Sequence, residues 1–283
     1  PGNAMDPIFF FCMPDKRELE ENGGREYSSD PFGEIEYMPV ERLIHRFRDR
    51  VLVFAHDQCA VNCRHCTRKN TIRQASHWAS LEDCLGDITE YLIKHGEIRE
   101  VLFSGGDPLL METERLDRAL EMLRRASTVE VIRIGTRVPV TLPMRIDDEL
   151  CDMLARHRPL WLNTQFNHHV EITEDSIRAC EMFICRGIPV SNQSVLLRGV
   201  NDSIREMELL CTGLQKNMIR PYYVFDCDPV VGTAHFKCEP GCAARLAEAL
   251  RVRIGGLCVP RFVADVPGEK GKVSLEHYQS ELA

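Results

Sequence analysis

The chain has 283 residues, 44% of them hydrophobic, which is enough for one large core. Its 43 acidic and 35 basic side chains give a formal charge of −8, which argues against nucleic-acid binding through a broad basic face. No apolar stretch is long enough to span a bilayer, and the thirteen cysteines lack the layout of a secreted disulfide scaffold, so we expect a cytoplasmic protein.

After a polar lead-in from Asp15 to about Glu36, strand-like runs alternate with amphipathic helical segments. This rhythm is typical of a parallel sheet covered by helices. We expect strands over 51–55, 101–104, 131–135, 160–166, 190–196 and 222–225, and helices near 81–95, 113–125, 147–156, 174–185 and 203–216. Six such units predict an incomplete α/β barrel, in which functional groups gather at the carboxyl ends of the strands.

Cys59, Cys63 and Cys66 follow the first predicted strand with the spacing C-x3-C-x2-C. Three thiolates in one loop can each bind one iron of a four-iron cluster and leave the fourth iron open for a small molecule. A structural zinc site with His65 as fourth ligand is one alternative, but adjacent His65 and Cys66 would be hard to wrap around one tetrahedral ion. Plain core cysteines are the other alternative, although a polar, charged loop is not core patterning. The spacing favours the cluster.

A glycine pair, Gly105 and Gly106, followed by Asp107, comes directly after the second predicted strand. Glycines let backbone approach a ligand closely, and an acidic residue beside them can bind an ammonium group. A tight strand-to-helix turn uses the same residue types. The motif alone leaves both interpretations open.

The cysteine loop, with the Thr-Arg-Lys sequence that follows it at 67–69, resembles the signature of the radical S-adenosylmethionine (SAM) superfamily, and within it the lysine 2,3-aminomutase family. The resemblance runs from about His45 to Lys272 and includes segments 104–109, 161–164, 192–202, 220–223 and 258–260. It implies an α/β fold: a partial (β/α)6 barrel of the radical SAM type over 45–256, an N-terminal extension over 1–44, and a C-terminal strand and lysine segment over 257–283.

The resemblance also implies an isomerase that moves the α-amino group of L-lysine to the β-carbon and so gives β-lysine. Its cofactors would be a [4Fe–4S] cluster, SAM and pyridoxal 5′-phosphate (PLP), with a flavodoxin or ferredoxin as electron donor. Gly105, Gly106 and Asp107 would bind SAM, with Gln165 and Gln193 near it. Gln165 stands where relatives commonly have histidine, and a glutamine cannot titrate.

The lysine that binds PLP in the family lies seven residues after a substrate-binding aspartate, and Lys272 lies seven after Asp265. A lysine seen alone is ordinarily a solvated surface residue, and the resemblance favours the covalent role instead. Glu269 and Lys270 interrupt the glycine-rich loop of the family. Lys270 is therefore a rival for the cofactor.

Arg46 and Arg50 match family arginines near the PLP phosphate, with a solvated basic stretch as the alternative. Arg68 matches the arginine that pairs with the substrate carboxylate. Asp228 and Asp265 match two aspartates that hold the distal ammonium of lysine, although either could be an ordinary surface residue. Two carboxylates around one cation would repel an acidic side chain, which argues against glutamate as the substrate.

Three alternatives remain open from the sequence. The same chemistry could supply β-lysine for modification of a translation elongation factor, or act on arginine or ornithine. The chain could also be an iron–sulfur redox module without turnover. Ser203 stands where relatives have a zinc-binding cysteine, and the chain stops at Ala283 without their cysteine-bearing tail, so we expect no structural zinc and a homodimer or a monomer.

Overall fold

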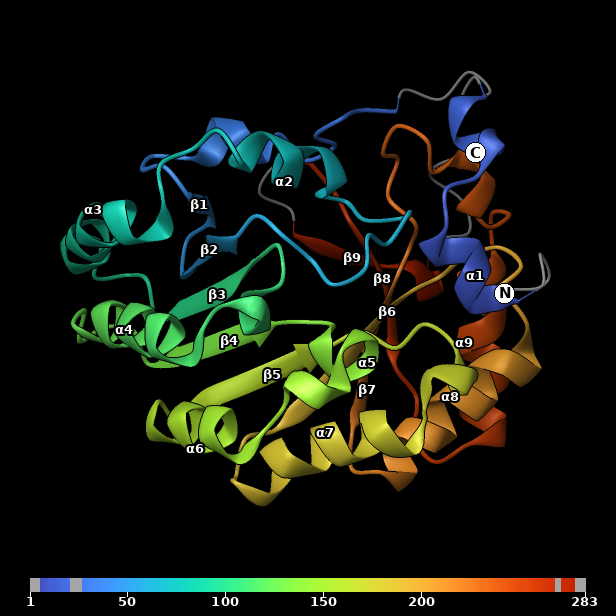
Figure 1. Cartoon of the computed structure of the whole chain (residues 1–283). Helices are drawn as coiled ribbons and strands as arrows, with labels where there is room; N and C mark the ends of the chain where they lie inside the picture. Colours follow the sequence, from blue (N-terminus) through green and yellow to red (C-terminus); the bar gives the residue numbers. More distant parts are fainter. Residues whose placement is uncertain (1–5, 21–26, 268–270, 278–283) are drawn as a thin grey trace.

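The computed structural model describes residues 6–20, 27–267 and 271–277, and one mixed sheet forms its centre (Figure 1). The strands lie in the sheet in the order in which they occur in the chain. Their bounds are β1 Leu43–Phe47, β2 Arg50–His56, β3 Glu100–Gly105, β4 Val131–Gly135, β5 Leu160–Thr164, β6 Val190–Val195, β7 Arg220–Phe225, β8 Arg261–Asp265 and β9 Lys272–Ser274. Strands β2 to β8 are parallel, and β1 and β9 pair antiparallel at the two ends, so the described sheet stays open.

The helices are α1 Pro7–Cys12, α2 Lys69–Ala75, α3 Leu81–Lys94, α4 Thr113–Arg124, α5 Val138–Thr141, α6 Asp148–Arg156, α7 Glu174–Cys185, α8 Ile204–Lys216 and α9 Cys242–Arg253. Short 3-10 helices lie at η1 Lys16–Leu19, η2 Glu34–Tyr37, η3 Pro108–Leu110, η4 Pro143–Arg145, η5 His169–Glu171, η6 Ala234–Phe236 and η7 Leu275–His277. Between consecutive parallel strands come α3, α4, α6, α7, α8 and α9 in turn. These crossovers confirm the predicted partial (β/α)6 barrel, with β8 as a further parallel strand.

Alternation along the strands separates the core from the inside of the barrel, because successive side chains of a strand point to opposite faces. On β3, Val101 and Phe103 are fully buried in the core that the helices cover. Leu102 and Ser104 face the inside and line a cavity. The alternation along β3 therefore gives the cavity one set of side chains and the helix-covered core the other.

Several elements were not predicted from the sequence, among them α1, α2 and α5, and two of the others bear on the site and the core. His45 and Arg46 lie in β1, an antiparallel strand, where we expected a basic stretch before the first strand. The Arg46 side chain is buried and contacts Asp265 of β8. Helix α9 was not predicted, and its buried face is carried largely by alanine and leucine, including Leu246 and Leu250.

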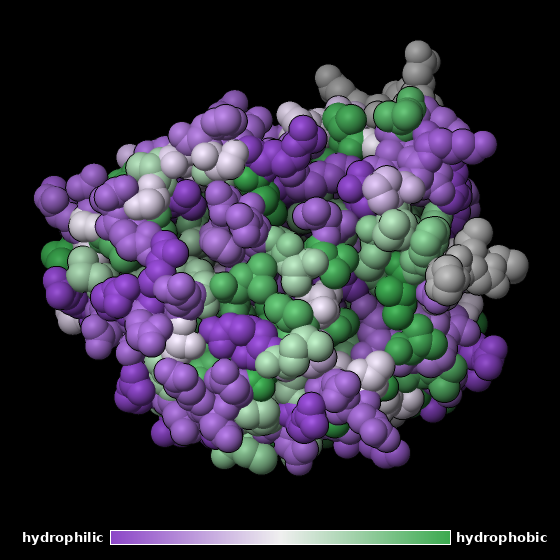
Figure 2. Space-filling view, viewed as in Figure 1, coloured by the Kyte–Doolittle hydropathy of each residue, from purple (hydrophilic) through white to green (hydrophobic). Residues whose placement is uncertain are grey.

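Helix α1 packs over the cysteine loop. Phe11 is fully buried with Leu197 and Phe236, and its carbonyl accepts a hydrogen bond from the backbone N–H of Arg64 at 2.9 Å. Figure 2 shows the face of the molecule that is turned to the viewer in Figure 1. Its side chains are mostly hydrophilic, with apolar ones gathered near its centre and towards α1. Among the described residues, no helix is both long and apolar enough to cross a membrane.

Candidate functional site

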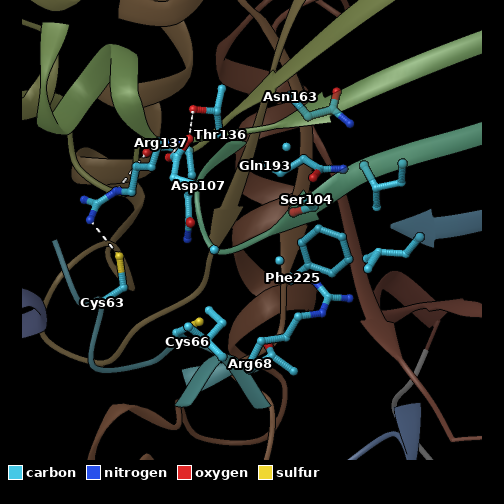
Figure 3. A pocket seen from close by; sticks show the side chains of 18 of the residues that line it. Cys63, Cys66, Arg68, Ser104, Asp107, Thr136, Arg137, Asn163, Gln193 and Phe225 are labelled. Carbon is cyan, nitrogen blue, oxygen red and sulfur yellow. Dashed lines mark hydrogen bonds between the residues drawn. The ribbon is translucent and has the colours of Figure 1, made fainter. Parts of the chain in front are cut away.

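A cavity of about 350 Å³ lies inside the partial barrel, lined by strand ends and by the loop after β2 (Figure 3). Its wall contains every site residue predicted from the sequence: Arg46, Arg50, Cys59, Cys63, Cys66, Arg68, Gly105, Gly106, Asp107, Gln165, Gln193, Asp228, Asp265 and Lys272. Residues far apart in the chain thus meet in one space. Lys270, the rival for PLP, lies outside the described residues.

The glycine pair holds the cysteine loop against the end of β3. The backbone N–H groups of Gly106 and Asp107 donate to the carbonyls of His56 at 2.8 Å and Gln58 at 2.7 Å. A Cβ on Gly106 would lie 2.5 Å from the Gln58 oxygen. Gly105 has a φ of +109°, which only glycine adopts readily. The packing of this loop therefore requires both glycines, whatever ligand they also contact.

The three cysteines of the loop, Cys59, Cys63 and Cys66, carry free thiols and line the cavity. Burial raises the pKa of Cys59 to about 12 and that of Cys66 to about 11. Deprotonation of such thiols near neutral pH requires a metal or another positive charge close to the sulfur. The three thiols are therefore suited to binding a metal centre, and without one Cys59 and Cys66 would stay protonated at neutral pH.

His65 has one ring nitrogen engaged by amides, while its Nδ1 is buried without a hydrogen-bond partner among the described residues. Its Nε2 lies 3.1 Å from the amide nitrogen of Gln165 and 3.3 Å from that of Asn167, and both amides donate to it. Burial lowers the pKa of His65 to about 3, so its ring is neutral. Three thiols without this histidine fit an iron–sulfur cluster with an open iron better than a Cys3His zinc site.

Asp107 fixes the loop that follows β4. One of its carboxylate oxygens accepts from the Thr136 hydroxyl at 2.6 Å and the Leu109 N–H at 3.1 Å, and the other accepts from the backbone N–H groups of Arg137 and Val138 at 2.7 and 3.1 Å. Burial raises the pKa of Asp107, and these hydrogen bonds oppose that rise. Its contact with the amine of SAM stays a prediction.

Asn163 is a polar wall residue that the sequence did not single out as a site residue. It is 95% buried on β5, and its Nδ2 has no hydrogen-bond partner among the described residues. Figure 3 places it beside Gln193 of β6 and near Ser104 of β3. An unpaired buried amide costs about 1–3 kcal/mol. A bound ligand that accepts this hydrogen bond would remove that cost.

Asp265 and Lys272 face each other across the β8–β9 hairpin. They are register partners, and Nζ of Lys272 lies 3.6 Å from the nearer Asp265 oxygen. Directly opposed residues on antiparallel strands share one face, which gives the seven-residue spacing a structural reason. The rings of Tyr223 and Phe225 lie 5.9 and 5.5 Å from Nζ. Arg46 contacts the other Asp265 oxygen at 3.4 Å.

Arg50 lies near Arg46 at the start of β2. Its guanidinium pairs with Asp49 at 2.8 Å and lies over the ring of Phe47, 4.3 Å from the centroid. Two guanidinium groups on neighbouring strands of the cavity wall suit a phosphate group, since their planar donors match its oxygens.

Asp228 is a half-buried carboxylate of the cavity wall that forms no ion pair with a described residue. It accepts a hydrogen bond from the Thr67 hydroxyl at 2.9 Å. Burial, and then the charges of Asp265 and Asp226, raises the pKa of Asp228 to about 7, against the effect of that hydrogen bond. A cationic ligand would stabilise the ionised carboxylate.

Arg68 is held by Glu34, a residue that the sequence analysis placed in the polar lead-in. Nε and Nη2 of Arg68 donate to the two Glu34 oxygens at 2.7 and 2.5 Å. Both side chains line the cavity, and Glu34 is 94% buried. This fork fixes the guanidinium and leaves its Nη1 without a hydrogen bond to any described residue. No local pattern around Glu34 indicated this partner.

A second group of titratable side chains, His168, His169 and Glu206, lies outside the cavity. The Glu206 carboxylate is 3.1 Å from Nε2 of His168 and 2.8 Å from Nδ1 of His169. Nδ1 of His168 accepts from the Val170 N–H, so Nε2 carries the proton in the neutral ring and faces Glu206. The group lies between η5 and α8, and Nδ1 of His169 and one Glu206 oxygen are buried without a hydrogen-bond partner among the described residues.

Residues 54–211 match the family model of the radical SAM superfamily. The L-lysine 2,3-aminomutase of Acetoanaerobium sticklandii is 44% identical over 96% of this chain, which spans 65% of its length. The putative L-lysine 2,3-aminomutase of Aquifex aeolicus is 40% identical over 97% of this chain and 74% of its own. The glutamate 2,3-aminomutase of Clostridioides difficile is 36% identical over 97% of this chain and 64% of its own.

Solved structures of radical SAM proteins share the fold. A radical SAM methyltransferase from Sphaerobacter thermophilus aligns over 79% of this chain and 68% of its own with a TM-score of 0.55 and 19% identity. Native anSMEcpe with bound AdoMet aligns over 70% of this chain and 58% of its own, with a TM-score of 0.53 and 15% identity. At these identities the likeness concerns the fold alone.

Proposed function

This chain belongs to the lysine 2,3-aminomutase family of the radical SAM superfamily, and on that basis we propose that it is an isomerase that converts L-lysine to β-lysine. The observation that carries the choice of substrate is Asp228, a half-buried carboxylate of the cavity wall with a hydroxyl as its hydrogen-bond partner. A terminal ammonium placed there would gain a charge-assisted hydrogen bond and relieve the cost of burying the carboxylate.

Three groups of side chains would hold the cofactors. Cys59, Cys63 and Cys66 would bind a [4Fe–4S] cluster with SAM on its open iron, and Lys272 would bind PLP covalently. Arg46 and Arg50 would take the PLP phosphate. The chemistry that these cofactors supply when bound is hydrogen-atom abstraction and stabilisation of a substrate radical. The protein contributes the orientation of the amino acid and a wall that keeps water from the reacting carbons.

The charges of the cavity would orient an amino acid with its carboxylate at Arg68 and its side-chain cation at Asp228. The fork between Arg68 and Glu34 presents Nη1 to the substrate carboxylate, and Asp228 receives the distal cation. Asp265 lies beside Lys272 and adds a second negative charge on that side. A glutamate side chain would meet these two carboxylates and be repelled. This supports lysine over glutamate, although a glutamate 2,3-aminomutase is among the relatives.

The direct test is a substrate panel. The protein, reconstituted anaerobically with iron, sulfide and PLP and reduced chemically, is supplied with SAM and one of lysine, ornithine, arginine or glutamate, and β-amino acids are measured by mass spectrometry. We expect β-lysine to form fastest and no β-glutamate. Faster turnover of arginine or ornithine would assign that amino acid as the substrate instead of lysine. Cleavage of SAM without formation of any β-amino acid would contradict an aminomutase.

Asp228 also predicts a pH dependence. Its carboxyl must be ionised to bind an ammonium, and with a pKa of about 7 it ionises as the pH rises through 7. The kcat/KM for lysine is therefore expected to rise with pH, with a midpoint near pH 7, and to level off about one pH unit higher. Asp228→Asn should remove this rise and lower kcat/KM by about 100-fold or more, because a buried charged partner is lost.

Asp226→Asn is the matched control. Asp226 lies two residues away and pairs with Lys237, so this variant keeps the carboxylate that faces the cavity. It removes one charge that raises the pKa of Asp228. The rise in kcat/KM should therefore persist with its midpoint at lower pH. A wild-type profile that is flat between pH 6 and 8 would contradict the role of Asp228.

A further inference from the structure

Arg137, in the loop after β4, contacts the sulfur of one cluster cysteine. Its Nη1 is 2.8 Å from Sγ of Cys63 (Figure 3) and 3.9 Å from Sγ of Cys12, which comes from α1. The Arg137 side chain is 9% exposed and lines the cavity. A buried guanidinium therefore lies directly against the loop that would hold the cluster.

Further contacts fix this guanidinium. Nη2 pairs with Glu171, whose carboxylate also accepts from two backbone N–H groups of the loop after β5. Nε donates to the carbonyl of Gln165 at 3.2 Å. The Arg137 backbone is held by Asp107 at 2.7 Å. Turning the guanidinium away from Cys63 would break buried hydrogen bonds, each of which would leave an unpaired group.

A buried arginine–glutamate pair is in itself a structural feature, but it does not account for the direction of Nη1. Glu171 is satisfied by Nη2 and backbone donors, and Nη1 is aimed at sulfur instead. In the part of the chain that the structure describes, Cys63 is the one cluster cysteine whose sulfur accepts a hydrogen bond from a cationic side chain. The contact is asymmetric within the cysteine loop.

We propose that Arg137 is a positioning residue for the iron–sulfur cluster. Through its contact with Cys63, it keeps the Cys63 thiolate bound to iron and raises the reduction potential of the cluster. The proposal rests on the cluster of the proposed function and is independent of the substrate. Hydrogen bonds to the sulfurs and net charge set the potentials of iron–sulfur clusters. One-electron reduction adds negative charge, which a buried guanidinium stabilises. The Asp107 of the glycine motif supports the same residue through its backbone.

The test is an EPR-monitored redox titration of the reconstituted full chain without SAM or amino acid. Arg137→Gln should lower the equilibrium constant for reduction by about tenfold, equal to about 59 mV for one electron. It should also change the EPR g-values of the reduced cluster. Arg137→Lys keeps the charge without the planar fork, so a smaller shift is expected.

Arg133→Gln is the matched control, because Arg133 lies on β4, lines the same cavity and pairs with Glu100. Its potential and g-values should equal those of the wild type. Loss of iron from folded Arg137→Gln, with iron retained in the control, would support a role of Arg137 in keeping Cys63 bound to iron. Equal potentials and spectra in both variants would overturn the proposal. If Arg137→Gln does not fold, a wild-type potential in Arg137→Lys overturns it. A wild-type chain that takes up no cluster would overturn the proposed function as well.

Discussion

Alanine at any one of Cys59, Cys63 and Cys66 is expected to reduce the reductive cleavage of SAM to background. Each thiol would bind one iron, so the loss of one sulfur removes one of the three ligands that the loop supplies. The iron content after anaerobic reconstitution should fall together with the cleavage, measured as 5′-deoxyadenosine by chromatography. Wild-type chain should carry about four irons.

Cys185→Ala is the control for this prediction, because Cys185 is exposed at the end of α7 and does not line the cavity. It should keep both iron and activity. Wild-type cleavage by any of the three loop variants would rule out the cluster assignment.

Lys272→Arg is expected to abolish covalent PLP binding and to lower β-lysine formation by about 10³-fold or more, as removal of a covalent catalytic group does. Arginine keeps the positive charge beside Asp265, so the change isolates the amine that bonds to the cofactor. Borohydride reduction followed by peptide mapping should locate the label on Lys272 in the wild type. The visible absorbance of the bound cofactor should disappear in the variant.

Lys270→Arg provides the matched comparison two residues away. It should retain the label and the absorbance, because the register of the β8–β9 hairpin places Lys272 opposite Asp265. A label on Lys270 in the wild type would show that the loop of this chain has moved the anchor. A loss of SAM cleavage in Lys272→Arg would point to a general structural defect instead of a cofactor role.

Local sequence patterns predicted most of the parallel strands and crossover helices. The alternating apolar runs located the parallel strands from β2 to β7, and the amphipathic periods located most crossover helices. Helix α9 was missed because alanines carry much of its buried face, and alanine gives a weak apolar signal. Strand β1 was missed because Arg46 reads as a solvated charge, whereas its long side chain is buried against a carboxylate of β8.

The residues of the candidate site also fall into those that a local sequence pattern indicated and those that it did not. The cysteine spacing and the aspartate–lysine spacing are local patterns, and the structure brings both into one cavity. Glu34 and Arg137 had no such signal, because an acidic residue in a polar lead-in and an arginine after a strand are common. Their partners, Arg68 and Cys63, are more than thirty positions away in the chain. Pairing of this kind is set by the tertiary fold and not by local sequence.

The two antiparallel strands at the ends of the sheet also bear on self-association. A free sheet edge presents unpaired N–H and C=O groups to which another chain can add as a strand. Strand β9 has three residues, and the pairing of β1 shifts register between Ile44 and Phe47, so neither described edge offers a long regular ladder. The partial barrel can thus remain open while both described sheet edges are protected against edge-to-edge aggregation.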